Sequence, residues 1–215
     1  MNTFVIVGGT SGIGKSLADT LLTQGHTVHV ASRRTGLNIQ DPQSISQFFK
    51  TVGNFDHLVI TAGSFAPSGK VEDLDLSAAS DAFDTKFWGS IRLVQQAVPY
   101  LKGSITLTSG MLSRKVVAST LVKTAANAAL EASAKILAKE LAPIRVNVVS
   151  PGLTATEAYS TMDEQARSDM FIVAGKSLPV GRVATPQDLV AGYLLAIENP
   201  VITGSVIDIN GGALL

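Results

Sequence analysis

The chain has 215 residues with 17 basic and 17 acidic side chains, so its formal net charge is zero. This balance does not suggest nucleic acid or an anionic membrane surface as a partner. Hydrophobic residues make up 46% of the chain and charged residues 16%, which excludes a disordered chain and predicts one globular domain over residues 1–215.

The absence of cysteine excludes a disulfide, a thiol nucleophile and a cysteine metal site, and no other metal site is predicted. No apolar run reaches the roughly 18 residues that a membrane span needs. No signal peptide precedes the first predicted strand. We therefore expect a cytoplasmic protein.

The N-terminal segment predicts a strand, a glycine-rich turn and a helix. Thr3–Val7 is an apolar, β-branched run, which indicates a buried parallel strand. Ile13, Leu17 and Leu21 then recur every four residues, as on one face of a helix, and Gly25 closes that helix. Glycines let the backbone approach a ligand, and the start of the helix presents free N–H groups to an anion. The predicted phosphate-binding residues are Gly8, Thr10, Ser11, Gly12, Ile13 and Gly14.

Two phosphate motifs overlap in this turn. Gly9–Ser16 fits the P-loop pattern G-x-x-x-x-G-K-[ST], in which Lys15 would contact phosphates and Ser16 would bind magnesium. The spacing of glycines in VGGTSGIG instead resembles that of the short-chain dehydrogenase/reductase family, whose members bind a nicotinamide dinucleotide. These eight letters leave both interpretations open.

The end of the second predicted strand indicates the choice of cofactor. Thr27–Ser32 is followed directly by Arg33 and Arg34, and no acidic residue occurs between Asp19 and Asp41. In dinucleotide folds an acidic residue at this point binds the ribose 2′-hydroxyl of NAD, whereas arginine accommodates the 2′-phosphate of NADP. We expect Ser32, Arg33 and Arg34 to bind NADP(H). The alternative is a solvated surface pair.

The connection after this strand is short. Only Thr35–Ile39 separates Arg34 from a helix predicted over Asp41–Thr51, and a parallel crossover needs about a dozen residues. The sequence therefore predicts a Rossmann-type, doubly wound parallel α/β sheet whose helix between strands 2 and 3 is shortened or missing. The third strand would be a stub or would be reached by a tight loop, and Asn38 or Ile39 would lie against adenine.

Strands and helices alternate through the rest of the chain, which is typical of a parallel sheet. Strands are predicted at Asp56–Thr61, Ser104–Thr108, Arg145–Ser150 and Ile202–Gly212, and helices at Ser77–Tyr100, Thr120–Leu141 and Thr185–Glu198. Residues 155–180 are less regular and are interpreted as a lid over the substrate. No predicted strand ends in the aspartate that a P-loop protein needs for magnesium, which favours the dinucleotide.

The resemblance covers nearly the whole chain and implies further cofactor contacts. The pair Ala62-Gly63 matches the second half of the family's Asn-Asn-Ala-Gly, and Pro151-Gly152 after RVNVVS is a further match. The family holds the nicotinamide carboxamide and the diphosphate near the positions of Thr154 and Thr156. Family members also pair through long helices, so a homodimer or homotetramer is implied.

The resemblance fails at the active site. Family members use Asn, Ser, Tyr and Lys, with the Tyr and Lys four residues apart on one helix. Here Lys123 stands at the Tyr position, Asn127 at the Lys position, Gly110 at the Ser position, with Ser109 just before it, and Lys86 at the Asn position. Lys123 is then the titratable group at the donor position. The reference pKa of lysine, about 10.4, is close to that of tyrosine, about 10, so Lys123 could act as the acid in its place.

We therefore predict an atypical NADP(H)-dependent reductase of a small carbonyl or enoyl substrate. Lys123 would be its acid, Asn127 would bind the ribose, and Ser109 would orient the substrate. The substrate would be anionic if Lys86, Arg114, Lys115 and Lys123 gather at one site. Two interpretations stay open beside it: solvated surface lysines in a catalytically silent NADP(H)-binding sensor or partner subunit, and a P-loop protein.

Overall fold

The computed structural model describes residues 1–63 and 66–215. Its centre is one six-stranded sheet, in the order β2-β1-β3-β4-β5-β6, in which every pair of neighbours is parallel. The strands are β1 (Thr3–Val7), β2 (Thr27–Ala31), β3 (Phe55–Ile60), β4 (Leu101–Thr108), β5 (Arg145–Pro151) and β6 (Val206–Ile209). The predicted doubly wound α/β fold is confirmed.

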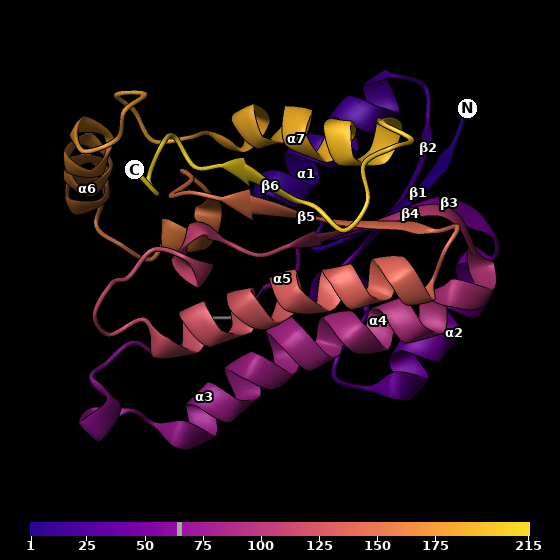
Figure 1. The fold of residues 1–215 in the computed structure, drawn as a ribbon, viewed down its shortest axis with the longest axis horizontal. Helices are drawn as coiled ribbons and strands as arrows, with labels where there is room; N and C mark the ends of the chain where they lie inside the picture. Colours follow the sequence, from indigo (N-terminus) through magenta and orange to yellow (C-terminus); the bar gives the residue numbers. More distant parts are fainter. Residues whose placement is uncertain (64–65) are drawn as a thin grey trace.

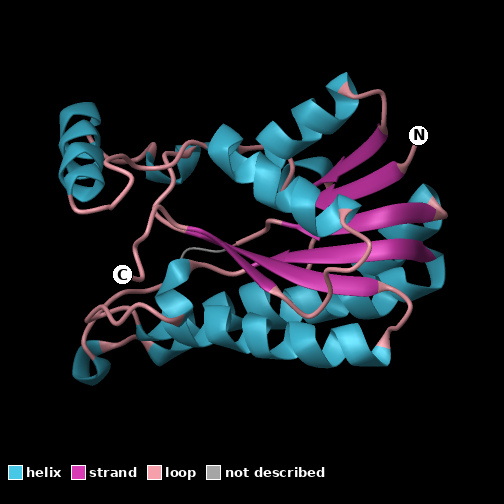
Figure 2. Cartoon of the chain, turned by 45° about the horizontal axis from the view of Figure 1, so that its top comes forward, coloured by secondary structure: helices cyan, strands magenta, loops and turns pink. Residues whose placement is uncertain are grey.

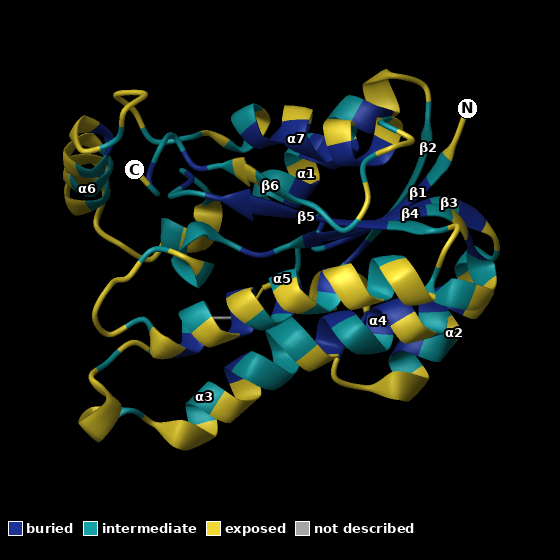
Figure 3. Ribbon diagram, in the orientation of Figure 1, coloured by how far each residue is buried: buried dark blue, intermediate teal, exposed yellow. Residues whose placement is uncertain are grey.

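Helices cover both faces of the sheet (Figures 1 and 2). Phe4 and Ile6 of β1 pack against α1 (Gly12–Thr23) and α7 (Pro186–Glu198) on one face. Val5 and Val7, which alternate with them, face the other layer. That layer consists of α2 (Pro42–Val52), α4 (Gly89–Ala97) and α5 (Leu121–Glu140). The inner strands β1, β3, β4 and β5 are therefore mostly buried, whereas the edge strands β2 and β6 are mostly intermediate (Figure 3).

The connection from β2 to α2 is as short as the sequence predicts. A 3₁₀ turn, η1 (Arg33–Thr35), follows β2, and Asp41 then caps α2 by accepting a hydrogen bond from Gln43 N at 2.9 Å. Pro42 occupies the first position of that helix, where its missing N–H costs nothing. No strand forms between η1 and α2, so the predicted third strand is absent and β2 is an edge strand.

The helix predicted over Ser77–Tyr100 is interrupted by a π turn. It runs as α3 (Leu76–Phe83), a π turn η3 (Asp84–Trp88), α4 and a final 3₁₀ turn. Gly89 follows the π turn, and a Cβ there would lie 3.0 Å from the Ile39 side chain. A π turn changes the direction of the residues inside it and often occurs at a functional site. Here it contains Lys86.

The C-terminal third contains a helix that was not predicted and a shorter last strand than predicted. Residues 155–180, which are predicted to be less regular, contain α6 (Glu164–Lys176), which lies apart from the sheet (Figure 1). The last strand is only Val206–Ile209 and not Ile202–Gly212. Gly204 and Gly211, both with φ of +66°, turn the backbone away from extended geometry at either end. Among the described residues no helix is long and apolar enough to cross a membrane.

Candidate functional site

The glycine turn brings the start of α1 against the end of β3. A Cβ on Gly14 would lie 2.4 Å from Thr61 Oγ1 and 2.5 Å from Gly8 O, and one on Gly8 would lie 2.6 Å from Ala62 N. Gly8 also has a φ of +93°, which favours glycine. Only glycine fits at both positions, and the predicted site residues from Gly8 to Gly14 and at Ala62-Gly63 therefore meet at the carboxyl edge of the sheet.

The first turn of α1 presents amides with few partners. The Ser11 side chain makes no capping hydrogen bond, so it does not satisfy the N–H groups of that turn. The Gly12 N–H donates a hydrogen bond of 2.8 Å to Glu157 Oε2. Glu157 lies in η6 (Glu157–Tyr159), at the start of the predicted lid. A carboxylate therefore contacts the end of the helix where an anion is favoured.

Two arginines without partners stand at the end of β2. Ser32 caps η1 through its hydroxyl, which accepts a hydrogen bond from Arg34 N at 3.1 Å. The side chains of Arg33 and Arg34 are exposed and have no hydrogen-bond or ion-pair partner among the described residues. Asn38 is also exposed, whereas Ile39 is buried and packs against α4. The turn thus presents two free guanidinium groups, which suit a phosphate.

The Pro151-Gly152 segment fixes the start of the lid. A Cβ on Gly152 would lie 2.8 Å from Asn210 Cα, so the chain passes β6 closely at this point. Thr154 is buried and its hydroxyl donates to Gly152 O at 3.1 Å. The Thr156 hydroxyl accepts a long hydrogen bond of 3.4 Å from Ala158 N at η6. Both threonines lie where the lid leaves the sheet.

The two lysines of the predicted catalytic set have different surroundings. Lys123 Nζ is 3.5 Å from Ser68 Oγ at an exposed contact. Lys86 Nζ instead donates to Ser109 O at 3.4 Å, at the end of β4. Burial lowers the pKa of Lys86 to about 8, because desolvation disfavours the charged ammonium. Of these two lysines, Lys86 is therefore the one whose amine is desolvated.

Asn127, another residue of the predicted catalytic set, has a side-chain oxygen without a hydrogen-bond partner among the described residues. Asn127 is 6% exposed and its Oδ1 has no hydrogen-bond partner among the described residues. A Cβ on Gly110 would lie 3.1 Å from Asn127 Nδ2, so the glycine makes room for the amide. A buried acceptor without a donor is costly, and a ligand hydroxyl can satisfy it. The amide therefore fits the expected ribose contact.

Ser109 takes part in a network that the sequence analysis missed. Its hydroxyl and that of Ser113 each donate to Glu131 Oε1 at 2.7 Å. Glu131 also forms an ion pair with Arg114, whose Nε is 3.3 Å from its Oε2. The only signal in the sequence is that Glu131 lies four residues after Asn127, on the same side of α5. The Ser109 hydroxyl is thus engaged by a carboxylate.

Arg114 does not add free positive charge. Its guanidinium donates to both Asp208 carboxylate oxygens at 2.7 and 2.6 Å and to Ser150 Oγ at 3.1 Å. These bonds raise the pKa of Arg114, with the Asp208 hydrogen bonds as the main cause. The prediction that Arg114 is one of the cations for an anionic substrate is wrong, because Asp208 and Glu131 neutralise its charge. Lys115 has no ion-pair partner among the described residues.

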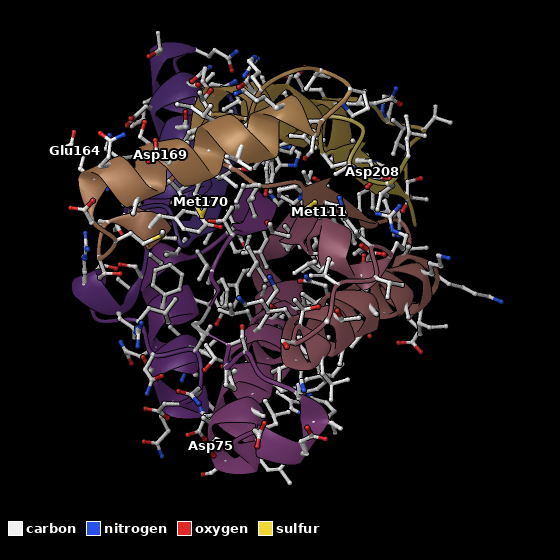
Figure 4. All side chains as sticks on the ribbon, turned by 90° about the vertical axis from the view of Figure 1, so that its left-hand side faces the viewer. Asp75, Met111, Glu164, Asp169, Met170 and Asp208 are labelled. Carbon is white, nitrogen blue, oxygen red and sulfur yellow. The ribbon has the colours of Figure 1, made fainter. Side chains whose placement is uncertain are left out.

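The lid and the loop before α5 add apolar surface at this end. Tyr159 and Phe171 stack edge to face with ring centroids 5.5 Å apart. Figure 4 looks at this end and shows Met170 on the side of α6 that faces the rest of the molecule. A pocket of about 290 Å³ lies nearby between η5 (Met111–Ser113) and the start of α5. Its lining includes Lys115 but none of Lys86, Lys123 or Asn127.

No group of three or more histidine and acidic side chains among residues 1–63 and 66–215 could hold a metal ion. Lys15, the P-loop lysine, is exposed and pairs with Asp19 at 2.5 Å. Three features of the site described above fit a phosphorylated dinucleotide: the glycine turn, the exposed arginines Arg33 and Arg34, and the unpaired Asn127 oxygen.

Comparisons with known proteins agree with this arrangement. A family model described as Enoyl-(Acyl carrier protein) reductase matches residues 35–213. Short-chain dehydrogenase/reductase ATR9 from Stachybotrys chlorohalonatus is 31% identical over 98% of this chain and 96% of that protein. Carbonyl reductase family member 4 from Danio rerio is 28% identical over 98% of this chain and 97% of its own length. A solved small-chain dehydrogenase in complex with NADPH is 56% identical, has a TM-score of 0.96, and aligns over 99% of this chain and 98% of that one.

Proposed function

Because this chain belongs to the short-chain dehydrogenase/reductase family, we propose that it is an NADP(H)-dependent oxidoreductase that reduces a small carbonyl or enoyl substrate. The observation that carries the proposal is the pair of free guanidinium groups on Arg33 and Arg34 beside the glycine turn. The NADPH complex of the similar small-chain dehydrogenase supports the choice of cofactor. Family membership also favours the dinucleotide over the P-loop interpretation of the glycine turn.

The cofactor would lie across the carboxyl edge of the sheet. Amides from Gly8 to Gly14 would bind its diphosphate, and Arg33 and Arg34 its 2′-phosphate. Ser32, Asn38 and Ile39 would line the adenosine side, and Asn127 would accept a hydrogen bond from a ribose hydroxyl. The nicotinamide end would be held by Ala62, Gly63, Pro151, Gly152, Thr154 and Thr156. When bound, NADPH supplies the hydride for the reduction.

The chain's own residues would bind the substrate and supply the proton. Lys86 and Lys123 are the two amines available for proton transfer, and Ser109 is held by Glu131 at 2.7 Å. Neither lysine has a carboxylate partner among the described residues, which supports an anionic substrate. The lid over residues 155–180 would exclude water from the reaction.

A catalytically silent NADP(H)-binding protein is the second candidate. Two observations favour it: Gly110 offers no hydroxyl, and the Ser109 hydroxyl is already engaged by Glu131. The experiment that separates the candidates is NADPH oxidation with a panel of aldehydes, ketones, keto acids and enoyl thioesters, with products identified by mass spectrometry. Turnover supports the oxidoreductase. NADPH binding without turnover on any member of the panel supports the silent protein.

We also propose that the protein is a cytoplasmic homodimer or homotetramer. Trp88 beside α4 and Leu121 and Ile136 on α5 are large apolar side chains that are at least half exposed. Small residues on α5, among them Ala125 and Ala132, would let a second copy approach closely. Light scattering tests the proposed oligomeric state, and a monomer at micromolar concentration would contradict it.

A further inference from the structure

The π turn η3 sends one amine into the protein instead of out to solvent. Lys86 lies in the middle of this turn, and its Nζ reaches Ser109 O at 3.4 Å. The Lys86 carbonyl accepts a hydrogen bond of 2.7 Å from the Ser90 hydroxyl, and Ser90 is buried. The turn is thus held by a buried partner, and the direction of the lysine is fixed by the fold.

The same short segment of chain receives the amide of Asn127. Ser109 accepts from Lys86, and Gly110, the next residue, lies against Asn127. An amine from the α3–α4 helix and an amide from α5 therefore converge on Ser109-Gly110, at the carboxyl end of β4. Ligands of open parallel sheets bind at this edge. The unpaired Asn127 Oδ1 shows that this corner has an unsatisfied acceptor for a ligand.

The ammonium of Lys86 has no ion-pair partner in the part of the chain that the structure describes. The charged side chains of η3 and of the helices packed against it, apart from Lys86 itself, are Asp81, Asp84, Arg92, Lys123, Glu131, Lys135, Lys139 and Glu140. Asp84 is paired with Arg92 at 2.6 Å, and Glu131 is engaged by Arg114 and two serines. None of these groups forms an ion pair with Lys86 among the described residues. An oxygen that gains negative charge beside Lys86 would be its partner.

We propose that Lys86, and not Lys123, is the catalytic proton donor of this enzyme. The inference rests on the proposed function. The carbonyl carbon gains a hydride from the reduced dinucleotide, the electron pair of the C=O double bond moves onto oxygen, and a proton passes from Lys86 Nζ to that oxygen. The products are the alcohol, the oxidised dinucleotide and a neutral amine, which takes a proton from water. With an enoyl substrate the same proton goes to the enolate.

Lys123 makes a matched comparison because it is also a lysine and lies on the neighbouring helix. Its Nζ contacts Ser68 at an exposed position, 3.5 Å away, and not the end of β4. Burial lowers the pKa of Lys86 toward the operating range of an acid, which suits proton donation near neutral pH. Replacing either lysine by methionine keeps the length of the side chain and removes its charge.

The test compares Lys86→Met with Lys123→Met. We expect Lys86→Met to lower kcat by about 100-fold or more, as loss of a general acid does, while the Kd for NADPH changes less than threefold. Lys123→Met should lose clearly less kcat than Lys86→Met, and Lys135→Met, at an exposed position on α5, is the control that should stay within threefold of the wild type. The opposite order, or equal loss in both, would overturn the proposal. If the wild type turns over none of the substrates in the panel, the proposed function fails. This result is distinguishable from failure of the Lys86 proposal, which requires an active wild type.

A second readout does not depend on turnover. In the protein labelled with ¹³Cε-lysine, one lysine resonance should titrate near pH 8, well below the others, and should be missing from the spectrum of Lys86→Met. A spectrum in which all lysines titrate near their usual pKa would overturn the proposal even for an active enzyme. Lys86→Arg provides a second variant, which keeps the charge but holds its proton; we expect it to bind NADPH and to turn over poorly.

Discussion

The Glu157 carboxylate accepts a hydrogen bond of 2.8 Å from the Gly12 amide, so the lid is tied to the first turn of α1. Gly12 is also close to Thr156, because a Cβ there would lie 3.4 Å from Thr156 Cγ2. The carboxylate contacts the same helix terminus at which the diphosphate of the cofactor would bind. The two anions would compete for this amide.

This competition predicts that Glu157→Gln binds NADPH more tightly than the wild type. Removing a carboxylate from a helix N-terminus frees about 1 kcal/mol for another anion, or roughly a fivefold lower Kd. Fluorescence titration of NADPH measures the change. Glu140→Gln, which removes one exposed negative charge from the last turn of α5, is the matched control. Weaker binding by Glu157→Gln would show that the carboxylate supports the cofactor instead.

Lys15 tests the P-loop interpretation. Its ammonium is exposed and pairs with Asp19 four residues later on α1. We predict that Lys15→Ala changes the Kd for NADPH less than twofold and the free energy of unfolding by less than about 0.5 kcal/mol, as is usual for an exposed helix pair. A P-loop lysine would behave differently. Loss of nucleotide binding in Lys15→Ala would contradict the dinucleotide interpretation.

The Arg114–Asp208 pair ties the loop after β4 to the last strand. Both carboxylate oxygens of Asp208 accept from Arg114, and each side chain is more than a third exposed. We predict that Asp208→Asn lowers the free energy of unfolding by about 1 kcal/mol, because a two-bond pair exceeds an ordinary surface pair but remains screened by water. Urea denaturation measures this loss. Asp73→Asn is the control, and equal values for both variants would contradict the prediction.

His57 makes stability depend on pH. The ring is buried, stacks on Phe4 at 4.9 Å and contacts Ser104 Oγ at 2.9 Å. Burial is the main cause that lowers the pKa of His57 to about 4, whereas an unfolded histidine titrates near 6.5. Between these values the unfolded state binds the extra proton. The contribution of His57 to the free energy of unfolding is therefore complete above pH 6.5 and is lost as the pH falls toward 4.

We predict that this loss amounts to about 3 kcal/mol in the wild type and is missing from His57→Gln. The measurement is the free energy of unfolding by urea at intervals between pH 7 and pH 4. Acidic groups that titrate in this range contribute to both proteins, so the difference between the two curves isolates the histidine. Parallel curves would contradict the assignment.

The sequence predicted the parts of the fold that depend on local patterns. Apolar runs such as Thr3–Val7 gave buried strands, and Asp41-Pro42 gave the start of α2 at the right residue. The short connection between β2 and α2 followed from chain length alone. These features were predictable because each is set by a few neighbouring residues.

The errors lie where distant contacts decide. α6 buries only Gly175, so it has little apolar periodicity, although Asp163 at its start was a usable signal because it caps Ala166 N at 3.0 Å. The π turn is followed by Gly89, which packs against Ile39, a residue 50 positions earlier in the chain. The pairing of Arg114 with Asp208 and Glu131 joins three separate elements. No local pattern predicts these contacts.

The central claim is that a dinucleotide with a 2′-phosphate binds this sheet through Arg33. The most direct test is calorimetric titration of the wild type and of Arg33→Ala with NADPH, NADH and ATP–magnesium. We predict that the wild type binds NADPH at least tenfold more tightly than NADH, that Arg33→Ala loses most of this preference, and that ATP–magnesium gives no comparable heat. Equal affinity for NADPH and NADH in both proteins, or tight binding of ATP–magnesium with none of NADPH, would contradict the account.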